Sequence, residues 1–256
     1  MGDTAAVSNE SLAQAYLGAV RQVLDRIEHT QMDAIAQAAD MIVDSLLNDG
    51  VVHLHDTGHL VQREAVHRAG GLLLLTALEY GFSVHNAGPA TTRRHSEAVR
   101  PDRVLGLAEL ALDNSKVRPG DVLIFGSVSG RNARDVALAL AAKARGVKLV
   151  AITSVAHSLA EESTHPSRKR LFEVADVTID NCGIVGDAAL EVESLDARFG
   201  PTSGIAAAAI VWMLSAAVIE RLVAAGKKPH VYKTVNLADG AEFNRRAEEE
   251  FKETGV

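Results

Sequence analysis

The sequence predicts an α/β fold in which helices cover both faces of a parallel β-sheet. Short apolar runs with the length of strands alternate along the chain with segments of helical spacing. Aromatic residues make up only 4% of the 256 residues, whereas hydrophobic residues make up 47%, so Ala, Val, Leu and Ile must build the core. Such a core suits helices on a parallel sheet better than an aromatic-rich β-sandwich.

The first elements along the chain are predicted helices that precede the sheet. Apolar residues keep helical spacing through residues 11–47. The polar stretch 29–31 divides this segment into two helices, and Thr30 is the predicted N-cap of the second. Residues 48–50, Asn-Asp-Gly, form a stop signal. We therefore expect an N-terminal helical extension.

The rest of the chain follows a strand-then-helix order. The predicted strands are residues 51–55, 72–75, 82–84, 122–125, 148–152 and 174–179. The predicted helices are residues 60–69, 103–112, 133–144 and 203–225. No linker or change in composition divides the chain, so we expect residues 1–256 to form one domain. Helices over residues 1–47 precede an α/β core with C-terminal helices over residues 48–256.

Composition excludes several classes of partner. The net charge of −7 argues against nucleic acid, which needs a basic face. The single cysteine, Cys182, gives no sign of an oxidising compartment. Residues 1–9 lack the pattern of a signal peptide. The longest apolar stretch, residues 205–219, is shorter than the roughly 20 residues that span a bilayer. We therefore expect a cytoplasmic protein with no nucleic-acid or membrane partner.

Three predicted strands end in segments rich in hydroxyl groups and glycine, at residues 56–59, 127–130 and 153–154. Ligands of open α/β sheets bind outside the carboxyl ends of the strands. Hydroxyl groups, backbone N–H groups and helix dipoles all favour an anion there, so the predicted ligand is a phosphate monoester. For any single Ser or Thr, a role as N-cap is the favoured explanation; three such strand ends in one sheet weigh against it, and this alternative stays open. The chain lacks the glycine patterns of dinucleotide and P-loop sites.

At these residues the chain resembles the sugar isomerase (SIS) domain family, over most of residues 30–247. The resemblance is to a branch of single-SIS proteins described as phosphosugar or phosphoheptose isomerases. The motifs that carry it are Thr57-Gly58-His59, Arg68-Ala69-Gly70-Gly71, Ser127-x-Ser129-Gly130-Arg131-Asn132, Ile152-Thr153-Ser154, Ala156-His157-Ser158, His165-Pro166-Ser167, Val177-x-x-Asp180-Asn181-Cys182, Gly200-Pro201-Thr202-Ser203 and Asn236-x-x-Asp239-Gly240.

The resemblance implies a three-layer sandwich with a central five-stranded parallel sheet of the flavodoxin-like type. It implies a phosphorylated sugar as partner, bound at the strand ends. The hydroxyl groups that correspond to the family's phosphate site are those of Thr57, Ser127, Ser129, Thr153 and Ser154. The expected substrate site also includes Asp56, Gly58, Gly130, Arg131 and Asn132. SIS domains pair, so we expect a homodimer or a dimer of dimers.

Three positions depart from the pattern of this branch. Asp56 stands where the branch has Gly, Leu60 where it has Ser, and Val128 where it has Asn. Leu60 removes one hydroxyl contact. Asp56 places a carboxylate near the predicted anion site, which like-charge repulsion disfavours. Either the ligand has shifted in this protein, or the activity is modified.

Aldose–ketose isomerisation needs a base that moves a proton between C1 and C2 and a group that opens the sugar ring. Glu64 is the leading base candidate, because it lies one turn into the predicted helix after the first site loop. An exposed helix carboxylate explains Glu64 equally well, and Glu79 is held in reserve. His59, in the site loop, and His157, which follows Ser154 by three residues, complete the predicted catalytic set.

The pattern His53-x-His55-Asp56, with His59, also raises a metal hypothesis. The spacing matches no strong signature, so this hypothesis ranks below acid–base catalysis, and we expect neither a metal nor a cofactor. For His53 a structural role is expected.

The predicted function is therefore a cofactor-independent isomerase of sugar phosphates. One alternative is a non-catalytic sensor or regulator that binds phosphosugars. It would act through a protein partner, since the chain shows no helix-turn-helix or basic extension. The other is a sugar-phosphate lyase or etherase on the same fold, which the sequence does not separate from an isomerase.

Overall fold

Five parallel strands form one sheet in the order β2-β1-β3-β4-β5. The structure is a computed structural model that describes residues 11–57, 62–81 and 101–256. The strands are β1 (Val52–Asp56), β2 (Leu75–Ala77), β3 (Val122–Gly126), β4 (Lys148–Thr153) and β5 (Val177–Asp180). This sheet confirms the predicted α/β class. The direction of winding reverses between β1 and β3, which creates a topological switch point at their carboxyl ends.

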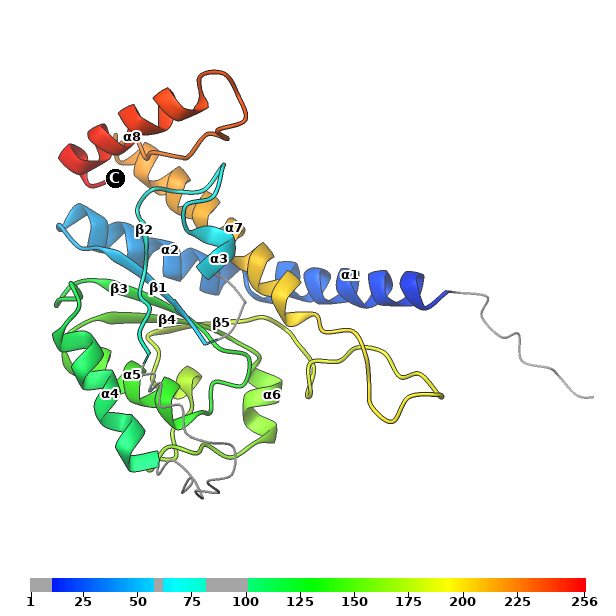
Figure 1. The fold of residues 1–256 in the computed structure, drawn as a ribbon. Coiled ribbons are helices and arrows are strands. Elements are labelled where there is room, and N and C mark those ends of the chain that lie inside the picture. Colours follow the sequence, from blue (N-terminus) through cyan, green and yellow to red (C-terminus); the bar gives the residue numbers. More distant parts are fainter. Residues whose placement is uncertain (1–10, 58–61, 82–100) are drawn as a thin grey trace, which may run out of the picture.

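Helices cover both faces of the sheet (Figure 1). They are α1 (Leu12–Thr30), α2 (Met32–Leu47), α3 (Gln62–Ala65), α4 (Pro101–Asp113), α5 (Ala133–Ala144), α6 (Val155–Ala160), α7 (Ser203–Ala224) and α8 (Gly240–Thr254), with a 3₁₀ helix at Leu171–Glu173. Helices α2 and α7 lie on one face, and α4 and α5 lie on the other (Figure 1). The three predicted layers are therefore present.

Alternate residues of the central strands face two separate cores, as the pleat of a strand requires. Ile124 and Ile152 pack with α2 and α7. Leu123, Phe125 and Leu149 pack with α4 and α5. Because both faces are buried, the strands read in the sequence as continuous apolar runs.

The N-terminal helices divide close to the predicted place. Helix α1 begins after a capping box in which the Ser11 hydroxyl accepts the Gln14 N–H. The residue between the helices is Gln31, which is the N-cap of α2. The prediction of Thr30 as this N-cap is wrong, because the Thr30 hydroxyl donates back to the Arg26 carbonyl at 2.7 Å.

The boundaries around β2 differ most from those predicted. The predicted strand 72–75 is mostly a buried connector, in which Leu72 forms an isolated antiparallel bridge with Val231, and β2 begins only at Leu75. The predicted helix 60–69 is described from residue 62 onward and ends early, since His67 has a left-handed φ of 53°. The predicted strand 82–84 lies outside the described residues.

Helix α7 is long and apolar enough to cross a membrane, judged by length and composition alone. In the structure, nine of its 22 residues are buried, and it packs against α2, α1 and the sheet core. The apolar side chains of α7 are therefore explained by its packing against α2, α1 and the sheet core. The organisation of residues 1–256 as one domain stays a prediction.

Candidate active site

A cleft lies at the topological switch point, at the carboxyl ends of β1 and β3. It consists of two adjoining cavities of about 430 and 440 Å³ that share His55, Asp56 and Arg134. We call it the switch-point cleft, and its lining residues are His55, Asp56, Thr57, Gln62, Arg63, Glu79, Tyr80, Gly81, Asn132, Arg134 and Asp135. This is the place where open α/β sheets bind their ligands.

The two histidines of β1 lie in different surroundings. His53 pairs through Nε2 with the fully buried Asp121 at 3.0 Å. The Asp121 carboxylate also accepts the N–H groups of Val51 and Arg118, each at 2.9 Å, so this cluster fixes the turn before β3. His55 lies two residues further along and lines the cleft. The expected structural role of His53 agrees with these contacts.

The metal hypothesis gains nothing from this arrangement. Across residues 11–57, 62–81 and 101–256, no three His, Cys, Asp or Glu side chains are grouped to hold a metal ion. His59 lies outside these ranges.

Asp135 is a buried carboxyl group in the first turn of α5, and it lines the cleft. The Ser127 hydroxyl donates to its Oδ2 at 2.8 Å. Burial raises the pKa of Asp135, and the hydrogen bond from Ser127 and the charge of Arg134 oppose that shift in part. A buried carboxyl group with a raised pKa in a cleft is a candidate acid–base group.

Arg134 precedes Asp135 and brings a positive charge into the cleft. Its Nη2 donates to the Tyr80 carbonyl at 2.6 Å, and its guanidinium carbon lies 4.4 Å from the centre of the Tyr80 ring. These contacts join the start of α5 to the segment after β2, although 54 residues separate the two in sequence.

Glu79 supplies a second carboxylate from the segment after β2. The Gln62 side-chain amide of α3 donates to Glu79 Oε1. Asp56, at the end of β1, supplies a third. Carboxyl groups from three segments thus line the same cleft as Arg134, and such groups accept hydrogen bonds from sugar hydroxyls.

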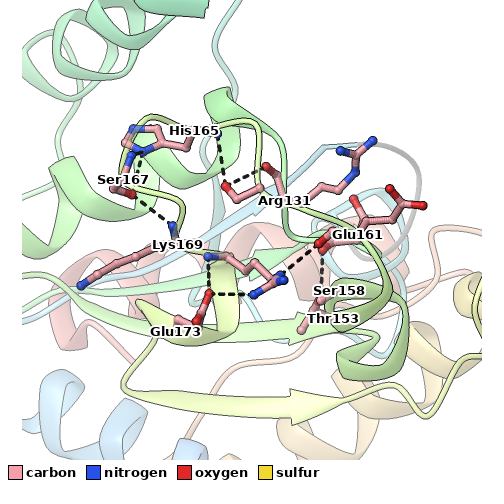
Figure 2. Close-up of polar contacts among 11 residues, drawn as sticks. Arg131, Thr153, Ser158, Glu161, His165, Ser167, Lys169 and Glu173 are labelled. Carbon is pink, nitrogen blue, oxygen red and sulfur yellow. Dashed lines mark hydrogen bonds and ion pairs between the residues drawn. The ribbon is translucent and has the colours of Figure 1, made fainter.

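The loop after β3 is held by α6 and by the segment that follows it. The Ser129 carbonyl accepts the Ser158 hydroxyl at 2.5 Å, and the Arg131 carbonyl accepts the Thr164 N–H at 3.0 Å. Figure 2 shows this network around Arg131 and Thr153. Gly130 has a φ of +55°, and an added Cβ would lie only 3.1 Å from Thr153 Oγ1. Only glycine meets both conditions without strain.

Comparison with known proteins identifies the family. A model described as SIS domain matches residues 15–154. The chain belongs to the SIS domain family. It is 33% identical over 244 residues to a UPF0309 protein of Shouchella clausii, covering 94% of this chain and 97% of the relative. It is 34% identical over 250 residues to a UPF0309 protein of Streptomyces griseus, covering 96% and 98%.

The solved structure of a phosphoheptose isomerase from Francisella tularensis has the same fold. It matches with a TM-score of 0.51 and 15% identity, covering 81% of this chain and 96% of that one. At this identity the match concerns the SIS fold alone.

The hydroxyl groups implied by the SIS resemblance occupy two different environments. Of the predicted substrate-binding residues, Asp56, Thr57 and Asn132 line the cleft. Thr153 and Ser154 are fully buried. The Thr153 hydroxyl donates to the Val128 carbonyl at 3.0 Å, and the Ser154 hydroxyl donates to the Gly183 carbonyl at 2.7 Å. In this structure these two hydroxyls hold loops together.

Other predicted residues of the phosphate loop also lie behind the cleft wall. Ser127 is buried against Asp135. Gly130 accepts the Leu171 N–H at 2.7 Å through its carbonyl. Arg131 directs its guanidinium to the Glu162 carbonyl at 3.0 Å. These residues shape the loop between β3 and α5, and a direct contact with a ligand stays a prediction for each.

The predicted catalytic residues lie apart from the switch-point cleft where they are described. The Glu64 carboxylate accepts the Trp212 Nε1–H at 3.2 Å and pairs with Arg68 at 3.1 Å. His157 Nδ1 accepts the Gly186 N–H at 2.9 Å. His59 lies outside the described residues, as does Gly58 of the predicted substrate site.

Sequence reasoning missed Arg134, Asp135 and Tyr80 as lining residues. The sequence did contain a signal for Arg134 and Asp135. This charged pair comes shortly after the glycine-containing loop, in the first turn of a helix whose N-terminus faces the candidate ligand site. Tyr80 had no such signal, because only the pairing of β2 with β1 brings it to the cleft.

Proposed function

We propose that this SIS protein binds a phosphorylated sugar in the switch-point cleft and interconverts its aldose and ketose forms without a cofactor. The observation that carries the proposal is the lining of the cleft. At the switch point of a SIS sheet, the carboxyl groups of Asp56, Glu79 and Asp135 line one cleft together with Arg134, beside the N-terminus of α5.

The start of α5 is the proposed place of the phosphate group. Asn132 is the N-cap residue, and its side chain makes no capping hydrogen bond within the described part of the chain. The Ala133 N–H donates to Thr164 at 2.9 Å, which leaves the later N–H groups of the first turn for an anion. Thr57 lines the same cavity. With the phosphate there, the sugar chain extends along the cleft toward Glu79.

Glu79 is the carboxylate that we propose as the base. In the open-chain aldose, it takes the proton from C2, the C2 electron pair forms the C1–C2 double bond, and O1 gains a proton, which gives a neutral enediol. Return of a proton to C1 and loss of the O2 proton give the ketose. Glu79 is favoured over Glu64 because it lines the cleft, whereas the Glu64 carboxylate contacts Trp212 and Arg68.

The test is turnover of a panel of aldose and ketose phosphates by the pure protein and two matched variants. Glu79→Gln and Glu64→Gln make the same change inside and outside the cleft. We expect Glu79→Gln to lower kcat by about 10²- to 10⁴-fold, the usual share of general acid–base catalysis, and Glu64→Gln to lower it by less than about tenfold. The reverse order would assign the base to Glu64.

The same panel separates the alternative functions. Thermal stabilisation by a sugar phosphate without turnover would indicate a sensor, and a product that has lost a substituent would indicate a lyase or etherase. Failure of every sugar phosphate to bind would refute the proposal.

We further propose a homodimer or dimer of dimers in the cytoplasm, without a nucleic-acid or membrane partner. Large apolar side chains are exposed around the start of α1 and of α7, at Leu12, Leu17, Phe199 and Ile205. Tyr16 ties this surface together, since its hydroxyl donates to the Pro201 carbonyl and its ring lies 6.5 Å from that of Phe199. Light scattering of Leu17→Glu should show loss of the dimer, and an unchanged mass would exclude this face.

A further inference from the structure

Three polar atoms in the switch-point cleft are buried and have no hydrogen-bond partner among the described residues. They are His55 Nε2, Tyr80 Oη and Arg134 Nε. Only one other side-chain atom of this kind, Asn181 Nδ2, occurs in the part of the chain that the structure describes. Since buried polar groups in folded proteins are nearly always paired, three such atoms in one cleft mark a place that can take up further hydrogen bonds.

The three atoms belong to one stack of side chains. The His55 ring lies 5.4 Å from the Tyr80 ring, with 29° between their planes. The Arg134 guanidinium lies 4.4 Å from the centre of the same ring, and its Nη2 donates to the Tyr80 carbonyl. The edge contact of His55 with Phe125, at 4.8 Å, anchors the stack to the core. We call these three residues the Tyr80 stack.

The hydrogen-bonding character of each unpaired atom follows from its neighbours. His55 Nδ1 lies 2.7 Å from the Leu78 carbonyl, which only accepts, so Nδ1 carries the proton and Nε2 presents a lone pair. Burial lowers the pKa of His55, which keeps the ring neutral. Arg134 Nε is a donor in every protonation state, and the Tyr80 hydroxyl both donates and accepts.

We propose that the Tyr80 stack is the subsite for the hydroxyl groups on the carbon chain of the ligand. This inference rests on the proposed function and adds the residues that recognise the polyol part of the sugar phosphate. A hydroxyl group donates one hydrogen bond and accepts others, so neighbouring hydroxyls pair His55 Nε2 and Arg134 Nε together.

Other ligand groups fit the stack poorly. A phosphate oxygen finds the lone pair of His55 Nε2 and the nearby carboxylates of Asp56 and Glu79, which repel it. A metal ion finds the Arg134 guanidinium, which repels a cation. The mixture of one acceptor, one donor and one hydroxyl is matched by uncharged hydroxyl groups, which both donate and accept hydrogen bonds.

Tyr80 lies at the centre of the subsite. Its ring is half-buried, lines the cleft and lies against both His55 and Arg134.

Two variants remove single unpaired atoms and keep the rest of the stack. Tyr80→Phe removes only the hydroxyl. His55→Asn keeps an amide donor for the Leu78 carbonyl and removes Nε2. Tyr16→Phe is the matched control, because it makes the same change at a hydroxyl that donates to Pro201.

The experiment is calorimetric titration with glucitol 6-phosphate and with inorganic phosphate, backed by a panel of aldose and ketose phosphates. We expect Tyr80→Phe and His55→Asn each to weaken binding of glucitol 6-phosphate about three- to tenfold, as loss of one hydrogen bond predicts. Their Kd for inorganic phosphate should stay within about twofold of the wild type, a change smaller than one hydrogen bond produces. Tyr16→Phe should change neither Kd.

The outcomes separate this inference from the proposed function. Equal weakening of both ligands, or unchanged binding of glucitol 6-phosphate by folded Tyr80→Phe and His55→Asn, overturns the subsite and leaves the proposed function standing. A wild type that binds neither glucitol 6-phosphate nor any sugar phosphate of the panel overturns both.

Discussion

The Tyr80 stack predicts a variant that folds more stably than the wild type. In Tyr80→Phe the ring keeps its contacts with His55 and Arg134. The loss is a buried hydroxyl that makes no hydrogen bond of good geometry, although the side chain of Arg134 lies near enough to oppose the rise that burial causes in the pKa of Tyr80. An unpaired buried polar group costs about 1–3 kcal/mol. Tyr80 is only half-buried, so we expect the lower part of this range, a gain of about 1–2 kcal/mol in the free energy of unfolding.

That gain corresponds to a higher melting temperature. A chain of this size shifts by about 2–4 °C per kcal/mol, so Tyr80→Phe should melt about 2–8 °C above the wild type. Differential scanning calorimetry without ligand measures the shift, and urea unfolding checks the free energy.

The control variant should change the free energy of unfolding in the opposite direction. Tyr16→Phe also deletes one hydroxyl, but that hydroxyl donates to the Pro201 carbonyl at 2.7 Å. We expect Tyr16→Phe to lose up to about 1 kcal/mol. A Tyr80→Phe variant that melts at or below the wild-type temperature would show that the Tyr80 hydroxyl is paired, and the reasoning from unpaired atoms would fail. A more stable variant with weaker ligand binding would show that the unpaired atom is retained for function.

Three further predictions test the loops and the buried carboxyl groups. Gly130→Ala places a Cβ at a φ of +55° and 3.0 Å from the nearest side chain, so it should lose about 1–3 kcal/mol by urea unfolding. Gly146→Ala has a similar φ and more room, with its nearest neighbour at 3.4 Å, and should lose less. Asp121→Ala leaves His53 and two backbone N–H groups unpaired and should lower the free energy of unfolding by about 3–5 kcal/mol. His53→Gln keeps a donor for Asp121 and should lower it by less. Equal losses would contradict the role assigned to Asp121. Burial raises the pKa of Asp135, so the folded state holds the proton of this carboxyl group more tightly than the unfolded state does. The protonated group therefore stabilises the folded state in acid, and this contribution is lost as the pH rises from about 3.8 through the raised pKa of the folded state. Asp135→Asn should remove that part of the pH dependence of unfolding, and parallel curves for the two proteins would refute it.

The central strands could be predicted from sequence because each is a short, fully buried run between turn signals. The predicted strand at residues 122–125 ends one residue before β3 does, and helix α5 has the predicted bounds. The region before β2 could not be predicted in the same way. Leu72 and Leu75 belong to one continuous apolar run, and periodicity does not distinguish a buried connector from a buried strand.

The place of the site could be predicted better than its lining. The rule that ligands bind at strand ends leads to the edge of the sheet that holds the switch-point cleft, where Asp56, Thr57 and Asn132 line it. Composition alone does not reveal which hydroxyls point outward. The hydroxyls of Thr153 and Ser154 donate hydrogen bonds to loop carbonyls. This division depends on tertiary contacts between segments far apart in sequence.

Asp56 conflicts with an anionic ligand only if the phosphate lies beside it. Asp56 lines both cavities of the cleft, as does Arg134, which belongs both to the first turn of α5 and to the Tyr80 stack. A ligand with its phosphate at α5 presents sugar hydroxyls to Asp56, which accepts hydrogen bonds from them. The reversed ligand would place its phosphate against the carboxylate of Glu79 and the lone pair of His55 Nε2. In the proposed complex, Glu79 and His55 therefore favour one direction of the sugar phosphate by penalising the reversed one, which is how an acidic cleft selects one pose of an acidic ligand.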